Sequence, residues 1–110
     1  MAKFVTIGYG DQDGYHRTDA AVRDGAHAHD VRLRAAGADM GIAGAPVQVR
    51  NHDDAGMTVQ SGPFMSSALP VAGFAIIEAA TMEEAVQLVS KTPCAVARGV
   101  VEVWPLQESP

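Results

Sequence analysis

The sequence predicts an α+β domain of ferredoxin-like topology, in which two helices cover one face of an antiparallel sheet. Three observations support this prediction. Segments with strand and helix patterns follow one another as β-α-β-hairpin-β-α-β, the order of a split βαβ arrangement. The length of 110 residues suits one domain, residues 1–110. The composition is 47% hydrophobic but only 5% aromatic, so the core must be built from small aliphatic side chains.

The chain begins with a predicted strand and a predicted helix. Residues 3–9 are rich in β-favouring side chains, and glycines end the run. A polar loop is expected from residue 10 to about residue 18. Residues 19–36 have the pattern of a helix, and Gly37 is its stop signal.

The spacing of side chains along this helix predicts which face is buried. One face at 3.6 residues per turn carries Val22, Ala26, His29, Leu33 and Ala36. We therefore expect His29 to face inward and His27 to face outward.

The middle of the chain is predicted to form short strands. Residues 38–43 form the first of these. Residues 46–50 and 57–60 flank the turn-rich His-Asp-Asp-Ala-Gly sequence and predict a hairpin. A loop rich in glycine, proline and serine follows over residues 61–70.

The last third of the chain repeats the strand-helix-strand order. Residues 72–79 are nearly all apolar and predict a central strand. Residues 81–84 form a capping box, and the helix they open is expected to stop before Pro93. Residues 99–104 alternate as a final strand, which Pro105 is expected to close.

Two helices on one face leave the other face of the predicted sheet uncovered. A second copy of the chain is the simplest cover, because homodimers are the commonest assemblies. The sequence therefore predicts a homodimer.

Charge and cysteine content narrow the classes of partner and compartment. The net charge is −5, with eight Lys and Arg against thirteen Asp and Glu, so no basic surface for nucleic acid or for anionic lipid is expected. No apolar run approaches the length of a membrane span, and the first residues do not resemble a signal peptide. The single cysteine, Cys94, needs no oxidising compartment. The expectation is a cytoplasmic protein.

Six short elements along the chain form a recognisable combination: Tyr9-Gly10, Ala35-Ala36-Gly37, Ser61-Gly62-Pro63-Phe64, Gly73 to Glu78, Thr81 to Lys91, and Val101 to Pro105. Together they resemble the YCII-related family, specifically its branch named for a DGPF tetrapeptide. The resemblance covers nearly the whole chain, and its C-terminal half is specific in combination.

The resemblance implies a dimeric α+β barrel. It also implies a histidine on the first helix that faces inward and pairs with an acid. Because of this pair, the family has been proposed to contain enzymes. At least one related protein is a dehydrochlorinase acting on a ring compound, whereas most members have no established reaction. This chain departs from the pattern in one loop, because Ser61 replaces the DGPF aspartate and Met65-Ser66-Ser67 replaces the acids that usually follow.

His29 is the predicted catalytic residue, with the role of a general base, because imidazole is a side chain suited in general to proton transfer. His27 also lies near the family position, but helical geometry favours His29. The alternative is a core histidine that bonds a backbone carbonyl. Both interpretations stay open, because no partner acid is identified.

The predicted substrate-binding residues are Tyr9, Ser61, Gly62, Pro63 and Phe64. In this interpretation Ser61 donates a hydrogen bond and Phe64 packs on a ring. The alternative is a structural turn, in which Gly62 and Pro63 set the backbone and Phe64 anchors the loop to the core.

No cofactor and no metal are predicted. His27 and His29 point to nearly opposite sides of the helix, whereas His27 and Asp30 share a side but are too few for zinc. The sequence has neither glycine-rich phosphate motif. Cys94 is expected to be a buried, inert thiol.

Two functions of different classes therefore stay open. The first is a cofactor-independent enzyme in which His29 assists proton transfer or elimination on a small organic molecule, in a pocket closed by residues 61–67. The second is a non-catalytic module that binds a small ligand or regulates a partner through the dimer. The loss of the loop aspartate favours the second function, and the inward histidine favours the first.

Overall fold

The computed structural model describes residues 1–107. The elements are, in chain order, β1 (Ala2–Tyr9), α1 (Gln12–His16), α2 (Ala20–Ala35), β2 (Asp39–Ile42), β3 (Val47–Arg50), the 3-10 turn η1 (His52–Asp54), β4 (Thr58–Ser61), β5 (Val71–Ala79), α3 (Met82–Val89), α4 (Pro93–Val96) and β6 (Val100–Leu106).

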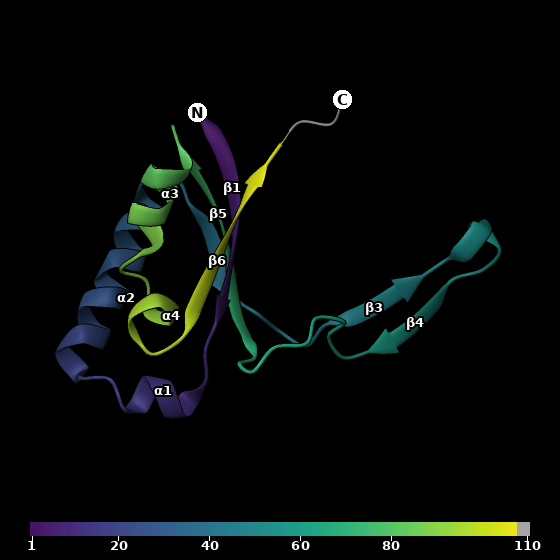
Figure 1. Cartoon of the computed structure of the whole chain (residues 1–110), viewed down its shortest axis with the longest axis horizontal. Coiled ribbons are helices and arrows are strands. Elements are labelled where there is room, and N and C mark those ends of the chain that lie inside the picture. Colours follow the sequence, from purple (N-terminus) through teal and green to yellow (C-terminus); the bar gives the residue numbers. More distant parts are fainter. Residues whose placement is uncertain (108–110) are drawn as a thin grey trace.

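Four strands form an antiparallel sheet in the order β2-β5-β1-β6. This is the ferredoxin-like order, so the predicted α+β fold is confirmed. Helices α2, α3 and α4 lie on the same side of the sheet (Figure 1). None of the helices within residues 1–107 is long and apolar enough to cross a bilayer.

The two faces of the sheet have different environments. Phe4 and Thr6 of β1 are buried beneath the helices, in register with Ile77 and Ala75 of β5. The core that they join is indeed built mainly of small aliphatic side chains. The opposite side, which we call the outer face, carries Val5, Ile7, Phe74, Ile76, Glu102 and Trp104.

Helix α2 buries a narrower stripe than its periodicity predicts. Ala26 and Leu33 are buried and His29 is half-buried, as expected. Val22 and Ala36, at the two ends of the predicted face, are exposed instead. The helix therefore packs on its neighbours through its middle turns.

Two short helices stand where the sequence predicts loop. Helix α1 occupies part of the expected 10–18 loop, because the Asp11 carboxylate caps it by accepting from the Gly14 amide at 2.8 Å. Helix α4 begins with Pro93, a residue preorganised for a first helical turn. Helix α3 starts at its capping box as predicted, with Thr81 Oγ1 accepting from the Glu84 amide at 3.1 Å.

The last strand, β6, ends two residues later than predicted, at Leu106 and not at residue 104. Pro105 lies inside β6 and does not close it. This is possible because β6 is an edge strand, where a missing N–H need not break the ladder.

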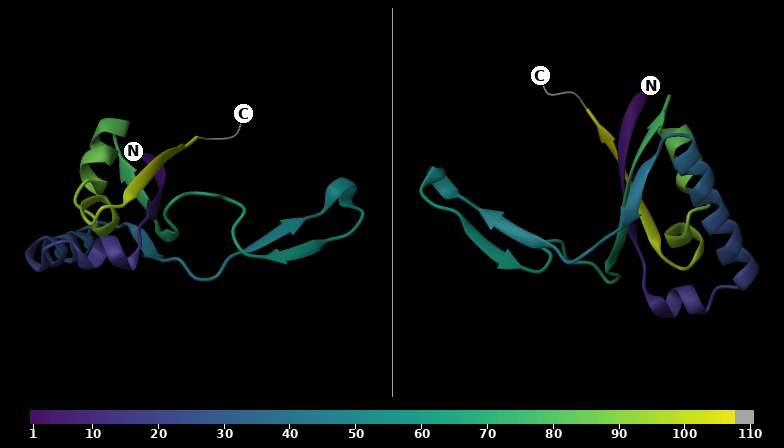
Figure 2. Two further views of the ribbon diagram at one scale, coloured as in Figure 1. Left: turned by 60° about the horizontal axis from the view of Figure 1, so that its bottom comes forward. Right: turned by 180° about the vertical axis from the view of Figure 1, so that it is seen from behind.

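The predicted hairpin is confirmed as a separate two-stranded sheet of β3 and β4. Residues 47–61, which we call the arm, project away from the main sheet (Figures 1 and 2). The arm is closed at its base by a hydrogen bond from the Gly62 amide to the Pro46 carbonyl at 3.1 Å.

Gly99 marks the tightest approach between β6 and its surroundings. A Cβ at this position would lie 2.1 Å from the Tyr9 carbonyl oxygen and 2.6 Å from that of Cys94. Both are backbone atoms, which cannot move aside by a change of rotamer. Only glycine fits between them.

We expect Gly99→Ala to lower the free energy of unfolding by about 1–3 kcal/mol or more, because overpacking usually has a cost of this size. The matched control is Gly25→Ala on α2, where a Cβ meets nothing within 4 Å. That change is expected to stabilise the protein by up to about 1 kcal/mol. Urea unfolding of both variants measures the difference, and equal stability of the two would contradict this packing.

Candidate functional site

A cavity of about 800 Å³ lies between the helix side of the sheet and the helices. It exists because the strands present very small residues there. Gly8 of β1 lies opposite Gly73 of β5, and Ala75 follows two residues later. These positions leave unfilled the volume that larger side chains would occupy. The remaining walls come from α1, α2 and α4 and the ends of β2 and β6.

Three polar side chains of α2 line this cavity: His27, Asp30 and Arg34. His27 is also exposed to solvent, in agreement with its predicted outward position. His27 and Asp30 are three residues apart, so they lie on the same side of the helix. Tyr15 of α1 approaches from the neighbouring element, and its hydroxyl lies 2.7 Å from His27 Nε2, within hydrogen-bonding distance. The Arg23 guanidinium stands over the Tyr15 ring at 4.9 Å and helps to hold it in place.

The Asp30 carboxylate is the electrostatically unusual group of the site. Its Oδ1 is buried and has no hydrogen-bond partner among the described residues. Burial raises the pKa of this carboxyl above its ordinary range, and the positive charges of Arg34 and the neighbouring histidines offset the effect only in part. A carboxylate held at such a cost beside a cavity is typical of a functional position.

Cys94 of α4 forms part of the cavity wall. Its sulfur occupies the space beside Gly8, where an added Cβ would lie 2.8 Å from Sγ. The side chain is partly buried, and burial raises its pKa, with a further contribution from the negative charge of Asp30. The thiol therefore stays neutral at neutral pH and acts as an apolar surface.

His29, the predicted base, has a different environment from His27. Its Nε2 lies 2.6 Å from the Leu88 carbonyl oxygen on α3. A carbonyl only accepts, so Nε2 must donate, and Arg32 Nη2 lies 3.5 Å from the remaining ring nitrogen. His29 thus joins α2 to α3 and is not among the residues that line the cavity. Its catalytic role stays a prediction.

The five predicted substrate-binding residues also lie elsewhere. Tyr9 is buried, and its hydroxyl donates to Glu102 Oε1 on the outer face at 2.8 Å, a bond that raises the Tyr9 pKa. Ser61 to Phe64 form the base of the arm, where the Phe64 side chain is 80% exposed. Phe64 therefore does not anchor its loop to the core.

One contact joins these two groups of residues. Met65 Sδ lies 3.5 Å from the Tyr9 hydroxyl, so the 61–67 loop touches the outer face of the sheet. The cavity lies on the helix side. Within one protomer the loop and His29 are not brought together.

A family model for the YCII-related domain matches residues 2–109. The chain belongs to the YCII-related family. The comparison with curated proteins finds no match.

The sequence contains one signal for this site, the shared side of the helix on which His27 and Asp30 lie, but periodicity alone does not show that this side meets a cavity. Helical spacing predicts that His27 and Asp30 share one side of the helix, and two such residues are too few for a zinc site. Tyr15 lies within the predicted 10–18 loop, and only its place in helix α1 brings it to His27. Among residues 1–107, no three His, Cys, Asp or Glu side chains are grouped to hold a metal ion.

We expect Asp30→Asn to stabilise the protein at neutral pH. The folded-state pKa of Asp30 lies above the unfolded one, so stability falls as pH rises from the ordinary aspartate range, about 4, through the raised value. Asparagine has no proton to lose, so its advantage appears above that window and shrinks below it.

Urea unfolding from about pH 3 to about pH 8 measures this difference. The matched control is Asp24→Asn, an exposed position on the same helix that does not line the cavity. The control should track the wild type at every pH. A destabilised Asp30→Asn variant at neutral pH would show that the carboxylate is satisfied after all.

Proposed function

We propose that this YCII-related protein binds a small, largely apolar organic molecule in the cavity and transfers a proton to or from it at His27. The observation that carries the proposal is the 2.7 Å approach of the Tyr15 hydroxyl to His27 Nε2 beside a largely apolar cavity that opens to solvent. A cavity of about 800 Å³ has the size of an ordinary small-molecule site.

His27 is the proposed base because it is the histidine that lines the cavity, and imidazole is the commonest general base in enzymes. Removal of a proton from carbon leaves an electron pair that forms a new double bond, while a leaving group departs as an anion or a carbonyl becomes an enolate. The imidazole takes up the proton. The Asp30 carboxylate, one turn along α2, then stabilises the imidazolium, and Tyr15 fixes the ring orientation.

Proton transfer of this kind needs no cofactor, which keeps the proposal within the cofactor-independent class. The assignment differs from the sequence prediction in the residue and not in the chemistry. His27 replaces His29 as the proposed base because it lines the cavity beside an acid, whereas both ring nitrogens of His29 already have neighbours.

A second candidate function is ligand binding without catalysis. It is favoured by Ser61, which stands where the family tetrapeptide has an aspartate, and by the outward position of Phe64. In that case the cavity still holds the ligand, and His27 and Asp30 only orient it.

We further infer that the chain belongs to the DGPF-type branch of the family and that the protein is cytoplasmic. The Ser-Gly-Pro-Phe sequence at 61–64 and the Val-Glu-Val-Trp-Pro strand support the branch, and the single cysteine supports the compartment.

A homodimer is also part of the proposal. Phe74 and Ile76 on the outer face of the sheet are exposed to a degree unusual for central-strand apolar residues. A second copy that covers this face would give the assembly two cavities on its two outer layers of helices.

Deuterium exchange tests the catalytic proposal. Small cyclic ketones and lactones are incubated with the protein in D₂O, and exchange at the carbon beside the carbonyl is followed by proton NMR. The wild type is expected to accelerate exchange, and His27→Gln to slow it by roughly 10²–10⁴-fold.

His29→Ala is the matched control, because it removes a histidine from the same helix outside the cavity. It should keep the exchange rate while losing about 1 kcal/mol of stability with its bond to Leu88. The opposite pattern would return the catalytic role to His29. Chemical-shift changes at cavity residues without any exchange would favour the non-catalytic function.

A further inference from the structure

We propose that the arm, residues 47–61, is an exchanged element that packs on the outer face of a second copy of this chain. The inference rests on the homodimer proposed above and goes beyond it, because it assigns the arm a partner surface. Three properties of the chain lead to it: its excess surface, the two-sided character of the arm, and the apolar outer face.

The single chain is too open for a compact monomer. It exposes 7675 Å², whereas a compact protein of 11.5 kDa exposes about 5,800 Å². Its radius of gyration is 15.9 Å, against about 13 Å for a compact chain of this length. The excess of roughly 1,900 Å² exceeds the roughly 800 Å² per partner that a standard stable interface buries.

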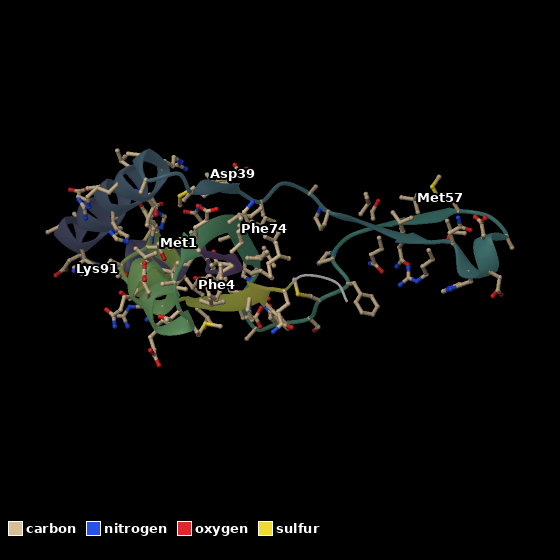
Figure 3. All side chains as sticks on the ribbon, turned by 90° about the horizontal axis from the view of Figure 1, so that it is seen from above. Met1, Phe4, Asp39, Met57, Phe74 and Lys91 are labelled. Carbon is tan, nitrogen blue, oxygen red and sulfur yellow. The ribbon has the colours of Figure 1, made fainter. Side chains whose placement is uncertain are left out.

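The arm is the main source of this openness, and it lacks support of its own. It extends far from the sheet, with Met57 at its distant end (Figure 3). A two-stranded hairpin in water is at best marginally stable. The arm therefore needs a surface against which to pack.

The two faces of the arm show which side packs. Val49 and Val59 are directly paired across the strands, and Val47 continues the same side, so they form an apolar stripe. Val49 is 62% exposed and Val59 is 56% exposed. The other side is polar and already bonded internally, since Arg50 Nη2 donates to Gln48 Oε1 at 2.9 Å.

The outer face offers the complementary apolar surface. Phe74 is 49% exposed and Trp104 is 56% exposed, although both belong to the main sheet. Val5 lies in register with Trp104 on one side and with Ile76 on the other, so these side chains form a continuous apolar band across three strands.

A second copy is the occupant that this arrangement favours. The arm points away from its own sheet in every view, so its stripe does not cover its own outer face (Figures 1 and 2). Under twofold symmetry each arm meets the other protomer's sheet, and the same pair of surfaces is used twice. The excess area is then buried without any further chain.

Sedimentation velocity over a concentration series tests the exchange with Val59→Glu and its control Gln60→Glu. The two substitutions add the same charge to adjacent exposed positions on opposite faces of β4. An unpaired carboxylate on a packed apolar stripe should weaken dimerisation at least about tenfold, whereas Gln60→Glu should stay close to the wild type. Far-UV circular dichroism verifies that each variant is folded.

Trp104 is the only tryptophan and reports on the outer face. Its fluorescence is expected to be blue-shifted and protected from acrylamide in the wild-type dimer, and red-shifted and quenched in Val59→Glu. If that variant fails to fold, replacement of residues 47–61 by two glycines serves instead, because the Pro46 carbonyl and the Gly62 amide already lie 3.1 Å apart.

The outcomes separate the arm from the dimer. A wild type that stays monomeric over the whole series overturns both proposals. A wild-type dimer that is unaffected by Val59→Glu, but is dissociated by Ile76→Asp on the outer face, overturns the exchanged arm and keeps the dimer. The exchange is supported if Val59→Glu weakens dimerisation and exposes Trp104, whereas Gln60→Glu does neither.

Discussion

The central pairing of β1 with β5 is the constraint on which the rest of this structure depends. These two strands run antiparallel over the length of the sheet and carry its smallest residues toward the helices, at Gly8, Gly73 and Ala75. Backbone hydrogen bonds hold the strands together whatever their side chains are. The pair can therefore forgo packing volume on one side, and that loss becomes the cavity.

The polar groups proposed to act in the cavity come from helices that pack against the sheet. Helix α2 carries His27 and Asp30, and the short capped helix α1 brings Tyr15 to them. Asp30 is held with a buried oxygen that nothing in the described chain satisfies. Such a group costs stability, and proteins tolerate that cost mainly where a ligand or a reaction makes use of it.

The outer face and the arm represent the same physical problem at two places in one chain. Each presents apolar side chains to solvent, and each belongs to an element with no second layer of its own. Because one polypeptide carries both surfaces, symmetry alone allows each to cover the other. This links the assembly of the protein to the inserted hairpin, which is absent from the simplest split βαβ arrangement.

The sequence by itself determined what depends on neighbours along the chain. The strands, the capping box at Thr81, the hairpin and the inward turn of His29 all follow from local propensity and periodicity. The ferredoxin-like topology follows from the order of these elements along the chain. Only the tertiary structure decided what each face meets. His29 is bonded to the carbonyl of Leu88, 59 residues further along, and His27 faces a cavity that exists because residues on other strands are small. Periodicity specifies a direction around a helix axis, but the atoms that lie in that direction come from distant segments, and no local pattern encodes them.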